Sequence, residues 1–507
     1  MIRSPDKSAH LGVGAAAYFV VALGLVAPRD VLHAQGRHEP ALAQSIESLV
    51  ARLPGRVVPL ATLIDAALRD GFDAQLAVAN RRRAEATAVY EGRAIDPVMH
   101  LSSDVASTPL TNLTASSMSQ GTTAGIEAAT PWGTVLSADV ARAGTLGATR
   151  FLSSSDAARF TVGVTQPLLD GLNQRTALWR AAQLERTGAV AQVIRTRQEV
   201  VAGIELQYWS LAEAQAVEAV YNRSVELSQD ILRRNEELAS RDLIANVDVL
   251  TVRSGVAFRE SLYTQARQIR REQSDALLFA AYGAAAAQLV DADTLPVLAV
   301  DNTMARIASP TLDEALRMAM VNRIDLRVVR ALRDAAQVRL AQARNGTLPS
   351  LAITAGWTSA STGIRTSAVA SDLRTSSAWR LGVSLGAPLL NRANRGQELL
   401  ASTQVDIETI RVRSAEAQVV REVRTTVRAL RMGGERAEVA SRAAALGWEQ
   451  LTAEHRRLEL GLGDSFRLLQ TEDGAVQSQL EAVRARYNML RANASYRLAI
   501  GTAPVSP

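Results

Sequence analysis

The chain has 507 residues, 47% of them hydrophobic but only 4% aromatic, and carries a formal net charge of +5 at neutral pH. It contains no cysteine, which excludes disulfides, thiolate metal sites, cysteine nucleophiles and a lipidated N-terminal cysteine. So low an aromatic content favours alanine-rich helices packed along their length over a thick globular core.

The charged and histidine residues predict neither a nucleic-acid partner nor catalysis. Arginines alternate with glutamate and aspartate instead of clustering with aromatic residues, a pattern typical of solvated helical faces. No two of the five histidines have the spacing of metal ligands or of a catalytic pair. They are His10, His33, His38, His100 and His455. We therefore predict that the protein is not an enzyme and binds no cofactor or metal.

Residues 1–34 predict a cleaved secretory signal peptide. Arg3 and Lys7 precede an apolar run over 11–27, and Ala34 is a small residue at the end of this segment. The alternative is a transmembrane anchor, but the apolar run is at the short limit of the ~17–25 residues that a span needs. Residues 35–59 are polar and predict an irregular linker at the mature end.

Two copies of one structural unit follow, at 60–283 and 311–501, separated by a polar linker at 284–310. Each copy opens with a predicted amphipathic helix, at about 60–93 and 312–344. A constant shift of 252 residues aligns Leu60 with Leu312, Ala67 with Ala319, Asp73 with Asp325, Ala84 with Ala336 and Pro97 with Pro349. The chain is therefore an internal duplication with a short tail at 502–507.

After Pro97 and Pro349 the hydrophobic period changes from helical to alternating, which predicts a β-hairpin region in each copy, at 97–168 and 349–389. The first region is the longer one. The extra residues include 123–140, itself a predicted hairpin that turns at 131–133. This segment either adds strands or forms an external loop.

Long helical hairpins are predicted at 171–283 and 391–500, because no proline occurs within 168–295 or 389–503 and a proline inside a helix costs roughly 3 kcal/mol. Both copies also carry a sevenfold apolar repeat, which is typical of coiled-coil packing. Its members are Ile204, Leu211, Val225 and Leu232 around Glu218, and Val423, Leu430, Ala437, Ala444, Leu451 and Leu458.

Each long hairpin is predicted to turn once, at 241–250 and at 460–469, with Leu250 aligned on Leu469. In the second turn Gly461 and Gly463 permit a tight backbone, and either Asp464 or Ser465 caps the outgoing helix. In the first turn Asn246 or Val247, with Asp248, is expected to do the same.

This order of elements, repeated twice, resembles the TolC-type outer membrane efflux proteins over about 60–501. The most specific pieces are Leu312-Asp-Glu-Ala-Leu316, Asn322-Arg-Ile-Asp-Leu326, Leu348-Pro-Ser-Leu351, Gln166-Pro-Leu-Leu169 and Gly461-Leu-Gly-Asp-Ser465. The resemblance implies a mainly α-helical, internally duplicated fold with membrane β-structure. In it, coiled-coil hairpins form a periplasmic α-barrel below an outer membrane β-barrel that three subunits share.

The resemblance also implies a function, the exit duct of a tripartite efflux or type I secretion system in the bacterial outer membrane. Its partners would be outer membrane lipid, a periplasmic adaptor protein and, through the adaptor, an inner-membrane pump. The alternative is a periplasmic coiled-coil adaptor, although adaptors typically carry one hairpin rather than two. The extra segment at 123–140 departs from the family's four strands per chain.

The resemblance assigns two sets of site residues. The hairpin tips, expected to contact the adaptor, are Arg241, Asp242, Leu243, Ile244, Ala245, Gly461, Leu462, Gly463, Asp464 and Ser465. The expected pore constriction is Asp248, Arg467 and Gln470. Some family members carry aspartates there, and Asp248 either matches one of them or is a plain helix cap. Three copies of Arg467 would form a positive ring, unless Arg467 faces the outer surface.

A positive ring could not close the pore by carboxylates alone. Closure would require Arg467 to pair with an acid such as Asp248 or Glu472. The alternative is an apolar plug from neighbours such as Leu462 and Phe466.

Overall fold

The computed structural model describes residues 46–109, 116–146, 156–289, 297–299, 310–363 and 377–504. The predicted signal peptide therefore lies outside the described residues, as do parts of both predicted linkers and of the C-terminal tail. None of the helices in the described ranges is long and apolar enough to cross a bilayer.

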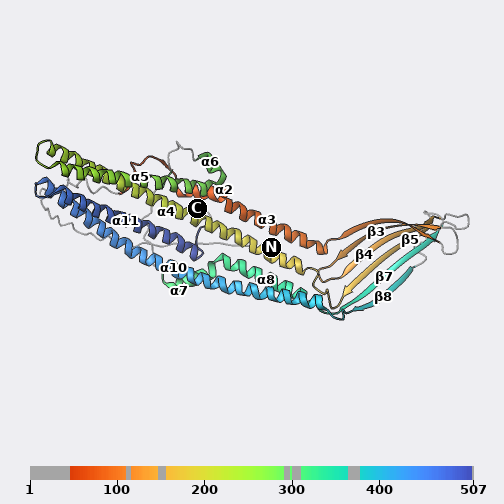
Figure 1. Cartoon of the computed structure of the whole chain (residues 1–507). Coiled ribbons are helices and arrows are strands. Elements are labelled where there is room, and N and C mark those ends of the chain that lie inside the picture. The colour runs from red at the N-terminus through yellow and green to blue at the C-terminus, as the bar shows by residue number, and fades with distance from the viewer. Residues whose placement is uncertain are drawn as a thin grey trace, which may run out of the picture. The chain divides into compact units, whose positions relative to one another are not determined.

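Two long helical hairpins dominate the structure, as the missing prolines predict (Figure 1). The first pairs α4 (Ala177–Ala239) with α5 (Asn246–Tyr282), and the second pairs α10 (Arg392–Glu459) with α11 (Ser465–Ala499). At ~1.5 Å per residue, the 63 residues of α4 extend about 95 Å. The α4 helix starts later than the expected residue 171, because Gly171 and Asn173 have positive φ angles of 89° and 56°.

The prediction of one continuous helix at the start of each copy is wrong. Each is two helices: α2 (Leu60–Asp70) and α3 (Phe72–Gly92) in the first copy, α7 (Leu312–Asn322) and α8 (Ile324–Asn345) in the second. The breaks fall at Gly71 and Arg323, which the shift of 252 aligns, and both residues are extended, with ψ of 138° and 116°. Breaking lets the short helix turn its buried face, such as Ala315 and Ala319, onto the long hairpin.

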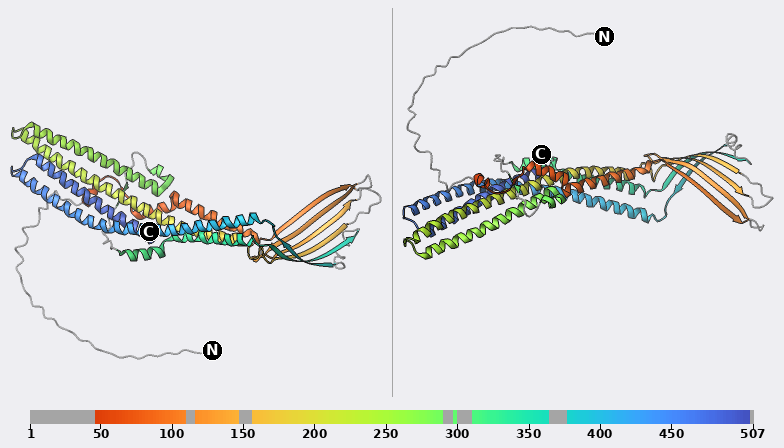
Figure 2. Two further views of the ribbon diagram at one scale, coloured as in Figure 1. Left: turned by 60° about the horizontal axis from the view of Figure 1, so that its bottom comes forward. Right: turned by 90° about the horizontal axis from the view of Figure 1, so that it is seen from above.

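The helices pack as a curved wall with α4 in its middle (Figure 2). Towards the tips the order across the wall is α5, α4, α11, α10, and towards the strands it is α3, α4, α8, α10. Helix α4 is therefore buried on both sides, and Tyr208, Trp209 and Leu211 join the largest apolar cluster. Helix α10 buries about one residue per heptad in a single seam. It forms one edge of the wall, and α3 and α5 form the other.

The prediction that residues 35–59 are irregular is wrong, because both predicted linkers contain helices and strands in their described parts. These are α1 (Ile46–Val50), β1 (Arg56–Val57), η2 (Gly283–Ala285), α6 (Ala286–Leu289) and β6 (Val297–Leu298). β1 and β6 pair in parallel. Buried polar groups of the first hairpin hold both segments: Arg270 donates to the carbonyl of Pro54 at 2.9 Å, and Gln215 accepts from the amide of Ala299 at 3.3 Å.

The strands form one antiparallel sheet of six, in the order β2-β3-β4-β5-β7-β8. They are β2 (Val98–Pro109), β3 (Ser116–Ala129), β4 (Val135–Leu146), β5 (Asp156–Pro167), β7 (Ser350–Gly363) and β8 (Ser377–Gly386). Of the two alternatives for the extra segment at 123–140, the structure shows that it adds strands, so the first copy holds four strands and the second two. β5 of the first copy pairs with β7 of the second, so both copies build the same sheet.

One face of the sheet is apolar and exposed. Met99 pairs with Ile126, Val140 with Phe160, and Trp357 with Trp379, so these side chains point to the same side. The exposed large apolar residues that the register places on this face are Met99, Leu101, Val105, Met118, Ile126, Leu136, Val140, Val162, Val164, Ile353, Trp357, Trp379, Leu381, Val383 and Leu385. The opposite face carries polar residues such as His100, which is 3.0 Å from Asp139.

Candidate functional site

The two hairpin tips have the same backbone geometry. Asp242 and Gly461, which align, have left-handed φ angles of 57° and 72°. In each tip the next amide closes the helix end: Leu243 donates to the carbonyl of Leu238 at 3.0 Å, and Leu462 to that of Arg457 at 2.9 Å. This is a Schellman-type ending. Among the turn glycines only Gly461 needs a positive φ, and Ile244 occupies the position that aligns with Gly463.

The two outgoing helices begin differently. In the second tip Asp464 is the cap, because its side chain accepts from the amide of Arg467 at 2.8 Å. In the first tip the N-cap is Ala245 and no side chain caps the helix, so the expectation that Asn246 or Val247 does so with Asp248 is wrong. Asp248 is exposed in the first turn of α5, where a carboxylate still interacts favourably with the helix dipole.

Both tips expose large apolar side chains. Leu243, Val247 and Leu250 in the first tip, and Leu460, Leu462 and Phe466 in the second, are each 64–74% exposed. Six such residues at the ends of two adjacent hairpins form an apolar surface. A gathered apolar surface of this kind is typical of sites that contact another molecule.

Arg467 is paired, but with an acid that the sequence reasoning did not name. Its Nε lies 3.1 Å from Oε1 of Glu454 on α10, and Arg457 approaches the same carboxylate at 3.8 Å. Neither Asp248 nor Glu472 is its partner. Helix α11 turns Arg467 back towards α10, where Glu454 is only 9% exposed. Gln470 and Asp248 are exposed on the surfaces of α11 and α5.

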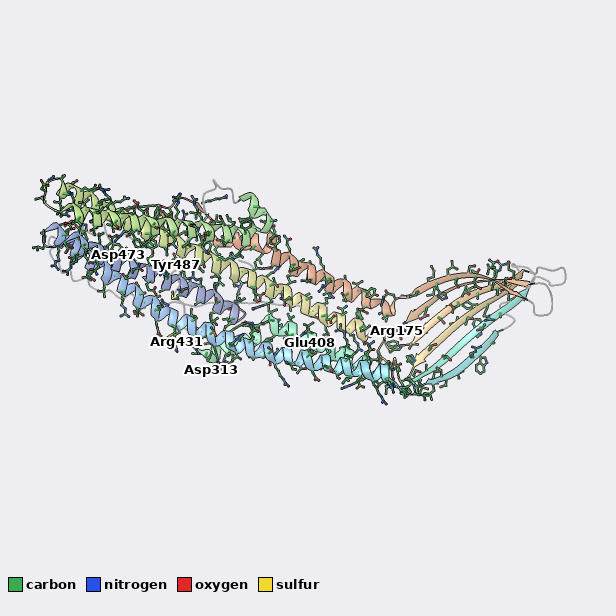
Figure 3. The ribbon with its side chains drawn as sticks, in the orientation of Figure 1. Arg175, Asp313, Glu408, Arg431, Asp473 and Tyr487 are labelled. Atoms are coloured by element: carbon green, nitrogen blue, oxygen red, sulfur yellow. The ribbon has the colours of Figure 1, made fainter. Side chains whose placement is uncertain are left out.

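Glu472 instead joins the two hairpins inside the wall. It accepts from the hydroxyl of Ser224 on α4 at 2.8 Å and lies 3.5 Å from Arg259 on α5. Arg259 also pairs with Asp473 at 2.6 Å, a residue that Figure 3 labels near the tip end of α11. Burial raises the pKa of Glu472 above its ordinary value, although Arg259 and Ser224 lower it.

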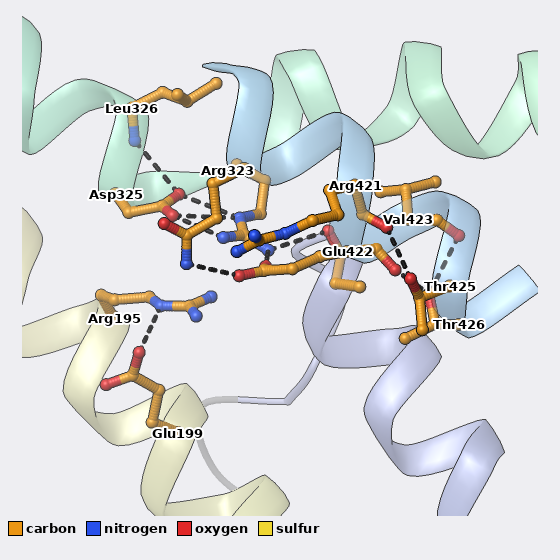
Figure 4. Close-up of polar contacts among 12 residues, drawn as sticks. Arg195, Glu199, Arg323, Asp325, Leu326, Arg421, Glu422, Val423, Thr425 and Thr426 are labelled. Carbon is orange, nitrogen blue, oxygen red and sulfur yellow. Dashed lines mark hydrogen bonds and ion pairs between the residues drawn. The ribbon is translucent and has the colours of Figure 1, made fainter. Parts of the chain in front are cut away.

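A second buried cluster holds the break between α7 and α8 (Figure 4). Arg323 is 2% exposed and donates to Asp325, to Glu422 at 2.7 Å and to the carbonyl of Ala499 at 3.2 Å. Burial opposes ionisation of Asp325, but the pair with Arg323 outweighs it and lowers the pKa of this carboxyl group. The aligned residue in the first copy is Gly71, so this cluster belongs to the second copy alone.

A cavity of about 970 Å³ lies where the sheet meets α4, α8 and α10. Arg175, Leu178, Arg339 and Gln404 are among its lining residues, and Arg175 is labelled in Figure 3. Its lining contains no histidine and a single acidic residue, Asp170. The lining therefore does not provide two groups that could act together as a general acid and a general base. The described residues also contain no cluster of potential metal ligands.

Sequence reasoning missed the ion pairs that join the helices. Two are buried, Arg270 with Glu218 and Arg259 with Glu472, and the third joins the half-exposed Arg467 to Glu454. One signal was available. Glu218 interrupts the apolar heptad of α4, and a charge at a buried seam position predicts a buried partner. The partner itself comes from a different helix, so its identity could not be read from local spacing.

Comparison with known proteins agrees with this geometry. Residues 315–502 match the family model described as outer membrane efflux protein. No curated protein matches the chain.

Solved structures match over most of the length. The outer membrane channel OprN is 16% identical, with a TM-score of 0.65 over 88% of this chain and 91% of that chain. The Campylobacter jejuni outer membrane channel CmeC is 14% identical, with a TM-score of 0.65 over 88% of this chain and 86% of that chain. The Vibrio cholerae outer membrane protein VceC is 16% identical, with a TM-score of 0.65 over 87% of this chain and 96% of that chain. At such identities the likeness establishes the fold.

Proposed function

We propose that this chain, a TolC-like outer membrane efflux protein with its helices in the periplasm, is the exit duct of a tripartite efflux or type I secretion system. We further propose that it works as a homotrimer that receives its substrate from a periplasmic adaptor and, through the adaptor, from an inner-membrane pump. The observation that carries the proposal is the six-stranded sheet, which has an exposed apolar face and two free edges.

The sheet suits a lipid environment only in a closed assembly. Its edge strands β2 and β8 have no further strand partner among the described residues, and unpaired backbone groups cost several kcal/mol each in hydrocarbon. Consecutive strands in the sheet are antiparallel and their number is even, so β2 of one copy and β8 of the next are also antiparallel. Three copies therefore close a barrel with the apolar face towards lipid and His100, Asp139 and Thr161 towards the lumen.

The adaptor contact is proposed at the hairpin tips, residues 241–245 and 461–465. Each tip combines a fixed backbone turn with exposed apolar side chains such as Leu243 and Leu462. An adaptor that lacks the outer membrane sheet would not need an exposed apolar β-surface, which makes the rival reading, a periplasmic adaptor, the weaker one.

The pore constriction is proposed to include Asp248, Arg467 and Gln470. Because Glu454 neutralises Arg467, three copies of Arg467 do not form a free positive ring. Closure then rests on the paired charges together with the exposed Leu462 and Phe466. We propose that changing Arg467 to Asp repels Glu454 and opens the closed state, which raises the conductance in planar bilayers. Unchanged conductance and selectivity would exclude these residues from the gate.

The tips are tested by two substitutions of Gly461. Valine is β-branched and strained at a φ of 72°, whereas aspartate already occupies the same conformation as Asp242. Gly461→Val is expected to abolish export from cells while heat-modifiable trimers still form, and Gly461→Asp to retain export. Equal export by both variants at equal expression would remove the tip from the contact. A monomeric wild-type protein released without detergent would refute the channel itself.

A further inference from the structure

Helix α10 carries an arginine-rich groove on the edge of the wall. Leu312, Arg424, Val427, Arg428 and Arg431 line a hollow of about 310 Å³, and Figure 3 labels Arg431 on α10. The three arginines are exposed. Within the described ranges none of them has an ion-pair partner, whereas Arg411 and Arg436 on the same helix do. Their charges are therefore available to another molecule.

The internal duplication predicts what this edge meets. A shift of 219 residues places Leu250 on Leu469 and the left-handed Asp242 on Gly461. The same shift carries the buried residues Ile204 and Leu211 of α4 onto the buried Val423 and Leu430 of α10. α4 thus corresponds to α10, and α5 to α11. Since α4 packs against α11 within the chain, α10 is expected to pack against α5 of another copy.

The interface within the chain is held by acids on α4 and arginines on α11. Glu205 pairs with Arg497, and Glu213 pairs with Arg491 at 2.5 Å. Arg497 is two residues before Ala499, whose carbonyl accepts from Arg323 at the α7–α8 break.

At two of the four matching positions between copies the charge is reversed, and at the other two, Met432 and Leu278, it is replaced by an apolar side chain. The shift carries Glu205 onto Arg424 and Trp209 onto Arg428, so α10 is basic where α4 is acidic. It carries Arg491 back onto Glu272 and Ala494 back onto Asp275, so α5 is acidic where α11 is basic. Glu272 and Asp275 are exposed. Glu272 accepts only from its neighbour Gln268 at 2.8 Å, and Asp275 has no partner in the described part of the chain.

We propose that Arg424, Arg428 and Arg431 on α10 of one copy bind Glu272 and Asp275 on α5 of a second copy. The inference rests on the proposed trimer and specifies which surfaces build it. Opposite charges facing each other favour this pairing and penalise others. A second charge match points the same way, because an antiparallel docking in this register brings Glu435 of α10 close to Arg267 of α5.

Apolar residues along the same edge extend the match. Gly188 of α4 packs against Ala331 of α8, and the shift of 219 carries Gly188 onto Ile407 of α10. Ile407 is 40% exposed and Ile410 63%. The counterpart of α8 is α3, whose Leu76 is 62% exposed. Docking of a second copy therefore also buries apolar surface nearer the strands.

The absence of cysteine makes cross-linking a direct test. In the full-length protein in outer membranes, Arg428→Cys combined with Asp275→Cys is expected to give covalent dimers and trimers on mild oxidation. Each single variant should give none. The control is Arg317→Cys with Asp275→Cys, since Arg317 is an exposed arginine on α7 that does not line the α10 groove. Equal cross-linking by the control pair, or none by the test pair, overturns the proposal.

A charge exchange separates this proposal from the proposed function. Arg424→Glu with Arg428→Glu is expected to reduce the trimer fraction at least tenfold, and adding Glu272→Arg with Asp275→Arg is expected to restore it. A wild-type trimer that is indifferent to both changes refutes this interface and leaves the channel intact. A wild-type protein that is monomeric by native mass spectrometry refutes both.

Discussion

Arg323 offers the sharpest test of how the structure is held together. Its side chain is 2% exposed and joins three elements, the α7–α8 break, Glu422 of α10 and the end of α11 at Ala499. Arg323→Ala leaves Asp325 and Glu422 without their cation and the Ala499 carbonyl without a donor. We therefore expect the α7–α8 junction to open locally while the long hairpins remain folded.

The magnitude follows from the burial of each partner. Removing one member of a buried ion pair costs about 3–5 kcal/mol. Asp325 and Glu422 are 29% and 32% exposed, so water partly replaces the lost cation and the lower end applies. A loss of about 3 kcal/mol corresponds to roughly 100-fold faster amide exchange through local opening. Arg323→Lys keeps the charge but not the planar guanidinium group, so its amide exchange rate is expected to lie between those of the wild type and Arg323→Ala.

Hydrogen exchange of the purified protein, followed on peptides from 312–345, measures this opening. The matched control is Arg330→Ala, because Arg330 pairs with Glu416 at 2.9 Å but both side chains are about 40% exposed. Exposed pairs are worth about 0.2–1 kcal/mol, so exchange should rise less than about fivefold. Equal acceleration by Arg323→Ala and Arg330→Ala would show that burial does not set the strength of the cluster.

Three further predictions use other residues. Because the pKa of Asp325 is lowered in the folded state, the stability that this carboxylate contributes is present above the ordinary carboxyl range and is lost as the pH falls through it. Amide hydrogen exchange at the α7–α8 junction should therefore accelerate below about pH 4 in the wild type and not in Asp325→Asn. Burial raises the pKa of Glu472, so the stability that this residue contributes is lost as the pH rises. Glu472→Gln should therefore remove the pH dependence of amide hydrogen exchange near Ser224, and a persistent dependence would implicate another group. An added Cβ at Gly71 would lie 2.3 Å from the Ala67 carbonyl oxygen, whereas one at Gly396 meets nothing within 4 Å. Gly71→Ala should therefore loosen the α2–α3 junction, and Gly396→Ala should stabilise α10 by about 0.5–1 kcal/mol. Similar thermal stabilities for the two variants would contradict this prediction.

The sequence was informative where one periodic signal governs a long element. The proline-free stretches and heptads predicted both hairpins, because a pattern that stays helical over sixty residues fits few other secondary structures. The short breaks at Gly71 and Arg323 escaped prediction, since amphipathic spacing continues on both sides of each. Gly71 is a local signal for the first break, but Arg323 gives none for the second, which depends on the packing of α7 onto the long helices.

The tips show the same division. The residue type of Gly461 indicates a left-handed turn. Asp242 adopts the same conformation without being a glycine, and only the alignment of the two copies relates these residues. The partner of Arg467 was not predictable, because Glu454 and Arg467 lie on opposite sides of the turn and meet only when α11 folds back on α10. Ion pairs across helices depend on register, which a shift of one residue changes.

The unequal copies bear on the width of the pore. The helical parts of the two copies match, while the sheet draws four strands from the first copy and two from the second. Four helices, α3, α4, α8 and α10, form the wall next to the sheet, and at ~8–10 Å between axes they span roughly 32–40 Å of circumference. Six strands at ~4.8 Å spacing and ~40° tilt span about 38 Å, whereas four would span about 25 Å. The extra hairpin thus brings the sheet to the width of its own helical wall. In the proposed trimer the barrel then continues the helical duct without narrowing, and at three times six strands it falls among barrels that hold an open aqueous channel.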